Sequence, residues 1–97
     1  MITRFEQAIL LSVCLANKGS LSSHVPKPYF MKKFQKTGKM QKHADRALHS
    51  LISLGFITVH PTRGEITYAL SQLGLEMCRN LKDKGFSILS LLASESE

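Results

Sequence analysis

The stretch from Asp45 to His60, DRALHSLISLGFITVH, changes its apolar period halfway along. Up to Gly55 the apolar residues recur every three or four positions, as in an amphipathic helix. After Gly55 they form a short β-branched and aromatic run, which is typical of a strand. Glycine also ends many helices, because it adopts the left-handed conformation at little cost. The sequence therefore predicts a helix that passes directly into a strand.

Size and composition limit what can surround this unit. The chain has 97 residues, of which 43% are hydrophobic and 21% charged. A chain of this length forms one domain that buries roughly 60 to 65% of its unfolded surface. It contains no apolar run near the roughly 18 residues that a membrane span requires. Because Arg4 and Glu6 precede any apolar run, no secretory signal is expected, and we expect a cytoplasmic protein.

Capping and stop signals divide the rest of the chain. Thr3 and Glu6 form a T-x-x-E capping box, and Gly19 follows the apolar period that they open. Pro28 suits the first turn of a second helix, which KTGK at 36–39 breaks. Ser71 suits the cap of a helix that ends near Gly85. Four helices are thus predicted, over about 3–17, 28–35, 39–54 and 71–85.

Between the last two helices the chain reads as a β-hairpin. FITVH and EITYAL flank PTRG, and apolar residues alternate in the second run. Pro61 suits the second position of a turn and Gly64 a left-handed position, so the tip should present Thr62 and Arg63.

This order of elements resembles the winged helix-turn-helix DNA-binding domains of small transcriptional regulators. The resemblance covers Thr3 to Gly85, so residues 1–85 form the predicted domain and 86–97 a tail. Its most specific residues are Arg46, Ala47, Leu48, Leu51, Gly55, Phe56, Ile57, Tyr68, Leu70, Ser71 and Gly74. It implies a mostly α fold with a small β-hairpin wing (α+β): a three-helix core, a two-stranded antiparallel wing and a C-terminal helix. It also implies that helix 39–54 enters the DNA major groove and that wing 56–70 touches the flanking backbone or minor groove.

Positive charge is concentrated in the same region. Residues 1–63 carry ten Lys or Arg against two acids, a net of +8, whereas residues 64–97 have a net of −2. Seven of the basic residues lie between Lys27 and Arg46, together with one acid. Such a region is typical of a surface that binds a polyanion.

The third helix supports this independently. At 100° per residue, one stripe without acids carries Lys39, Lys42, His43, Arg46, His49, Ser50 and Ser53. Lys42 and Arg46 repel at about 0.2–0.5 kcal/mol, and the helix dipole disfavours cations at the N-terminus by roughly 0.3–1 kcal/mol each. A surface selected only for solubility could relieve this strain with one Glu, whereas phosphates relieve it on contact and release counterions.

Roles within this surface follow from chemistry and reach. Gln41, His43 and Arg46 are predicted to read bases, with Arg46 bidentate to guanine. His49 extends the same stripe, and Arg63 at the wing tip is expected in a minor groove. The predicted phosphate contacts are Lys32, Lys33, Lys36, Lys39 and Lys42. The alternatives are a solvated basic face, a simple turn role for Arg63, and a salt bridge from Arg46 to Asp45 or another surface acid.

Other chemistry has little support. No nucleotide-binding, esterase or metalloprotease motif is present, so no enzyme or cofactor is expected. His43 and His49 are six residues apart and have no further ligand at metal-binding spacing. Cys14 and Cys78 are isolated and are predicted to be small buried hydrophobes.

The sequence leaves two questions open: which class of macromolecule the protein binds, and whether it forms a dimer. A winged helix can also bind protein, in which case Tyr29, Phe30 and Phe34 would matter more than the lysines. RNA is a weaker alternative, because no run of exposed aromatics is predicted. The apolar tail predicts a homodimer through the first helix, the fourth helix and residues 86–97, and the alternative is a tail folded against its own first helix.

Overall fold

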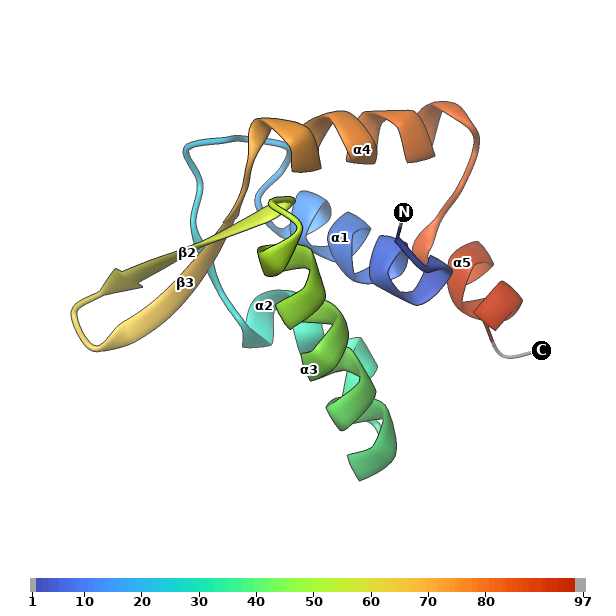
Figure 1. Ribbon diagram of the computed structural model, residues 1–97, viewed down its shortest axis with the longest axis horizontal. Coiled ribbons are helices and arrows are strands. Elements are labelled where there is room, and N and C mark those ends of the chain that lie inside the picture. The colour runs from blue at the N-terminus through green and yellow to red at the C-terminus, as the bar shows by residue number, and fades with distance from the viewer. Residues whose placement is uncertain (1, 96–97) are drawn as a thin grey trace.

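The first helix, α1 (Arg4–Ala16), runs through the middle of the fold, and the other helices pack around it (Figure 1). The computed structural model describes residues 2–95, with side chains as far as Ala93. Met1 and residues 96 and 97 of the predicted tail lie outside the described residues. Thr3 caps α1 as predicted: its hydroxyl accepts from the Glu6 N–H, and the Glu6 carboxylate accepts from the Thr3 N–H.

The next three elements lead to the basic helix. They are α2 (Pro28–Met31), the 3₁₀ turn η1 (Lys32–Phe34) and α3 (Gly38–Ser53). The predicted start at Pro28 is confirmed, although the second turn tightens into η1. The third helix begins one residue before the predicted position, because the Thr37 hydroxyl accepts from the Met40 N–H at 3.0 Å and caps it. It ends at Ser53, and Gly55, two residues further on, has a φ of 86°, which confirms the left-handed stop.

A three-stranded antiparallel sheet follows, in the order β1-β3-β2. The hairpin strands are β2 (Ile57–Thr62) and β3 (Glu65–Leu70), and β1 (Val25–Pro26) pairs with the other edge of β3. The prediction for Pro61 was wrong, because Pro61 lies within β2 opposite Ile66. A two-residue turn, Arg63 and Gly64, connects the strands instead. Since β2 is an edge strand, Pro61 removes no ladder hydrogen bond that the sheet needs.

Two helices close the fold on the side away from the hairpin (Figure 1). Ser71 caps α4 (Gln72–Asp83) through the Gly74 N–H, as predicted. The tail forms α5 (Ile88–Glu95), which packs along α1 and buries Leu91 completely. The tail therefore folds against its own first helix, the alternative arrangement for that segment.

The core joins α1 to all its neighbours. Its largest fully buried side chains include Phe30, Phe34, Ile9, Leu10 and Met31. The described chain is thus an α+β fold with three helices, an antiparallel hairpin and C-terminal helices, consistent with a winged helix. No described helix has the length and apolar character needed to cross a membrane.

Both cysteines belong to this core, as predicted. Cys14 and Cys78 are 2% and 0% exposed, and the Cys78 thiol donates to the Leu10 carbonyl oxygen. Burial strongly raises the pKa of the Cys78 thiol, and the neighbouring Cys14 raises it further. A thiol that stays protonated in an apolar site is structural rather than reactive.

Candidate nucleic-acid interface

The outward side of α3 carries a row of cationic and imidazole side chains. The opposite side packs into the core through Ala44, Ala47, Leu48 and Leu51. We define the outer face of α3 as the exposed cationic and imidazole side chains on the side opposite this core contact: Lys39, Lys42, Arg46 and His49. Figure 1 shows α3 extending away from the body of the fold, and all four of these side chains are exposed.

The acids nearest to this face are occupied elsewhere. Asp45 lies on α3 but pairs with Lys27, whose Nζ is 2.7 Å from a carboxylate oxygen. The predicted alternative in which Arg46 pairs with Asp45 is therefore wrong, because Asp45 turns toward the segment before α2. Glu6 accepts from the Thr3 backbone N–H and lines a hollow together with Arg46, but the two side chains form no ion pair. Within residues 2–93, Arg46 has no carboxylate partner in the structure. The outer face of α3 thus keeps its positive charge.

The N-terminus of α3 adds to the same potential. Thr37 caps it, and its first turn contains no acid. The partial positive charge of the helix dipole therefore coincides with Lys39 and Lys42. A surface hollow of about 400 Å³ lies here, lined by Lys39, Lys42, His43 and Arg46. Three cations that repel one another, together with the His43 ring, surround a space in which an anion would relieve the repulsion.

The predicted base-reading residues do not all lie on the outer face. Arg46 is central to it. The His43 ring packs on Phe5 of α1, with 4.1 Å between ring centroids, so His43 is fixed on the flank that faces α1. Gln41 is exposed but lies about 140° around the helix axis from Arg46. Of the three, Arg46 has the most direct access to a groove that receives α3.

A second group of cations lies beside the start of α3. Lys32, Lys33 and Lys36 are exposed on η1 and the turn that follows it. They point outward because the neighbouring Phe30, Met31 and Phe34 fill the core. These lysines and the outer face of α3 belong to one segment, residues 32–49, in which Asp45 is the only acid, and η1 contacts α3 in the fold.

The wing tip places one more cation at the end of the hairpin. Arg63 has a φ of 41° and Gly64 a φ of 80°, the signs that a two-residue turn between twisted strands requires. Asn, Asp or Gly usually fills the first of these positions, because most other side chains are strained in the left-handed region. Strain at an exposed arginine is a reason to look for a function.

Contacts that the sequence does not reveal hold the base of the wing. The His24 ring stacks on His60 with 4.0 Å between centroids, joining the segment before β1 to β2. Thr67 is 6% exposed, and its hydroxyl donates to the His60 carbonyl oxygen at 2.7 Å. The small side chains of Thr67 and Ala69 on the central strand leave room for this stack. Period-2 alternation predicts the strands but gives no signal for such a contact across them.

Among the described residues the site consists of the basic helix α3 and the β2–β3 hairpin. No three of their His, Cys, Asp or Glu side chains gather as metal ligands would. The arrangement can present positive side chains to an extended polyanion. Comparison of the chain with protein-family models, curated proteins and solved structures finds no match.

Proposed function

We propose that this protein binds double-stranded DNA in a sequence-specific manner and acts in the cytoplasm as a small transcriptional regulator. In this proposal α3 enters the major groove, and the β2–β3 wing contacts the flanking backbone or the minor groove. The observation that carries it is the outer face of α3, whose cations form no ion pair with an acid among the described residues, since Asp45 pairs with Lys27. A duplex supplies phosphates on both sides of a groove wide enough for a helix.

The contacts divide into two kinds. Arg46, central on the outer face, is proposed to donate two of its guanidinium N–H groups to one guanine. Lys39 and Lys42 are proposed to hold phosphates on either side of it, aided by Lys32, Lys33 and Lys36. Gln41, His43 and His49 are proposed as secondary base contacts. His43 has the least freedom because Phe5 holds its ring.

Binding should depend steeply on salt. If the five lysines neutralise about five phosphates, log K against log [salt] should have a slope of about −4.5, roughly −0.9 per contact. Fluorescence anisotropy with a labelled random-sequence duplex over a series of NaCl concentrations measures this slope. Lys32→Gln and Lys36→Gln together should reduce its magnitude by about 2. A slope near zero for the unaltered protein would reject the proposed interface.

Arg63 offers a test that separates function from folding. Asn adopts the left-handed conformation more readily than Arg, so Arg63→Asn should leave the free energy of unfolding unchanged or raise it by up to about 1 kcal/mol. The same change should weaken DNA binding about tenfold, or ~1.4 kcal/mol, because it removes a charged donor. Thermal unfolding and anisotropy measure the two effects. Unaltered affinity would restrict Arg63 to its role in the turn.

Protein contact is the second candidate function, and one observation favours it. Tyr29 on α2 is 74% exposed. However, Phe30 and Phe34 are 2% and 0% exposed, so they are unable to contact a partner without unfolding. Retention on heparin with elution at high salt, unaffected by Tyr29→Ser, distinguishes DNA binding from this alternative.

We further propose a homodimer, with α1, α4 and α5 at the interface. Leu15 and Leu89 are 56% and 80% exposed and lie along one apolar hollow with Leu11, Phe86 and Ile88. Light scattering at micromolar concentration should give twice the chain mass, and Leu89→Glu should return it to the chain mass without loss of helix content. A monomer mass for the unaltered protein would exclude the dimer.

A further inference from the structure

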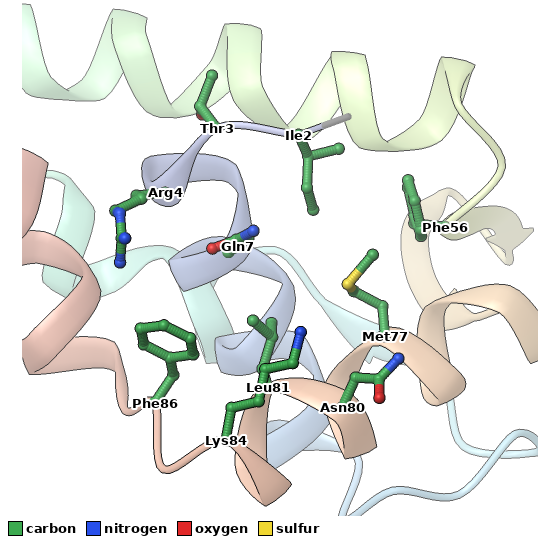
Figure 2. A pocket seen from close by; sticks show the side chains of 10 residues that line it. All are labelled: Ile2, Thr3, Arg4, Gln7, Phe56, Met77, Asn80, Leu81, Lys84 and Phe86. Atoms are coloured by element: carbon green, nitrogen blue, oxygen red, sulfur yellow. The ribbon is translucent and has the colours of Figure 1, made fainter.

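A groove on another part of the fold has no role in the proposed DNA contacts. It lies between the N-terminal segment and α4, has a volume of about 580 Å³, and has the end of α3 as its neighbour (Figure 2). Ile2 and Phe56 approach it from one side, and Met77 and Leu81 of α4 from the other. Ile2 and Leu81 are 6% and 4% exposed, so these two side chains belong to the hydrophobic core and form the floor of the groove.

The charged side chains around this floor are all positive. Arg4 and Lys84 are cations, Gln7 and Asn80 are amides, and no acid is among the described lining residues. The Arg4 guanidinium lies 5.3 Å from the centre of the Phe86 ring, which orients it at the edge of the groove. In Figure 2 the Lys84 side chain extends across the groove beside Leu81. Within residues 2–93 neither cation has a carboxylate partner.

We propose that this groove binds a small amphipathic monoanion, with its apolar body on Ile2, Phe56 and Met77 and its carboxylate between Arg4 and Lys84. Sites for small molecules are mostly apolar, of about 300–1,000 Å³, with a few converging polar groups, and this groove has that size and composition. Charge complementarity selects the class of ligand: two unpaired cations beside an apolar floor favour a fatty or aromatic carboxylate over a neutral or cationic molecule. The site does not depend on DNA binding.

Sodium octanoate is the probe for this proposal, and 1-octanol is its neutral counterpart of the same length. Protein labelled with ¹³C at the methionine and isoleucine methyl groups is titrated with each and followed by NMR. Octanoate should shift the Met77 and Ile2 methyl signals with a dissociation constant of about 0.1–1 mM, and octanol should bind about tenfold more weakly or not at all. Arg4→Gln and Lys84→Gln should each weaken octanoate binding about tenfold.

Arg79→Gln is the matched control, because Arg79 is an exposed cation on α4 that does not line the groove. Its octanoate affinity should equal that of the unaltered protein. Equal affinities for octanol and octanoate, or equal losses in Arg79→Gln and Lys84→Gln, would overturn the proposal. So would the absence of a Met77 shift, or Met77 and Ile2 shifts that appear on concentrating the protein alone, since a second copy would then fill the groove.

Discussion

Replacing Arg46 with glutamine should lower affinity for the preferred DNA site of this protein by about 5- to 150-fold, or ~1–3 kcal/mol, the range for one bidentate contact to a base. Arg46 is exposed at the middle of the outer face of α3, and its neighbour Asp45 is already paired with Lys27. The guanidinium is therefore free to donate two N–H groups to the O6 and N7 atoms of a guanine. The site is first selected from random duplexes with the unaltered protein, and affinities are then compared by anisotropy.

The control for Arg46 is again Arg79→Gln, which removes one positive charge from an exposed helix position on α4. Both variants lower the net charge equally, so any general electrostatic effect is common to them. Only Arg46→Gln should show the large loss of affinity, and only for the selected DNA site. Its thermal stability should stay close to that of the unaltered protein, because the side chain is exposed.

The set of preferred sequences gives a second readout for Arg46. Selection repeated with Arg46→Gln should lose the preference for guanine at one position and keep the others, because a base contact carries sequence information and a phosphate contact does not. Equal loss of affinity for every sequence would show that Arg46 binds phosphate. That result would leave the proposed DNA binding in place but remove Arg46 as the reader of a base.

The elements that the sequence predicts well are those with a local signal at each end. Thr3 and Glu6 cap α1 by contacts within one turn, and Ser71 caps α4 in the same way. Gly55 ends α3 by its own left-handed backbone. Because these interactions join residues that are close along the chain, the residue types alone are enough to place them.

The sheet shows where such reasoning fails. Pro61 is a common turn residue, but the register of β2 and β3 leaves only Arg63 and Gly64 outside the ladder. The register depends on which faces of the two strands reach the core, and this is a tertiary property. Strand β1 has two residues, Val25 and Pro26, which is too few for any period to be visible.

The candidate site also has a part that the sequence predicts and a part that only the fold determines. Helical geometry alone places Lys39, Lys42, Arg46 and His49 on the outside of α3, and all four are exposed. The partners of Asp45 and His43 are Lys27 and Phe5, which lie 18 and 38 positions away in the sequence. No spacing rule connects residues so far apart, so these orientations emerge only from the fold.

Replacing Gly74 with alanine should destabilise the protein by about 3 kcal/mol or more, the largest effect on stability expected from removing a glycine here. A Cβ at this position would collide with the carbonyl oxygen of Phe56 and crowd a Leu70 methyl group. Alanine is otherwise the better helix former by about 1 kcal/mol. The collision should outweigh that gain, because the Phe56 oxygen is a backbone atom and is unable to rotate aside as the end of a flexible side chain can. Thermal unfolding followed by circular dichroism should show a fall in Tm of about 10–20 °C.

Gly38→Ala is the matched control, because Gly38 is also helical but a Cβ there would meet nothing within 4 Å. It should be neutral or stabilising by up to about 1 kcal/mol. Ser71→Ala should cost about 1 kcal/mol by removing the cap of α4. If Gly74→Ala behaved like Gly38→Ala, the close approach of α4 to Phe56 would be excluded.

The Phe56 carbonyl has little freedom to move away from a new methyl group. It accepts from the Ser71 N–H at 3.1 Å, and the Ser71 hydroxyl lies at the same distance. The same hydroxyl accepts from the Gly74 N–H at 3.0 Å. Moving α4 outward together with its cap, Ser71, would lengthen both contacts to the Phe56 carbonyl and open the junction where α3 passes into β2. Gly74 is thus the position at which α4 can lie against that junction, and its small size is required for the direct passage from helix to strand.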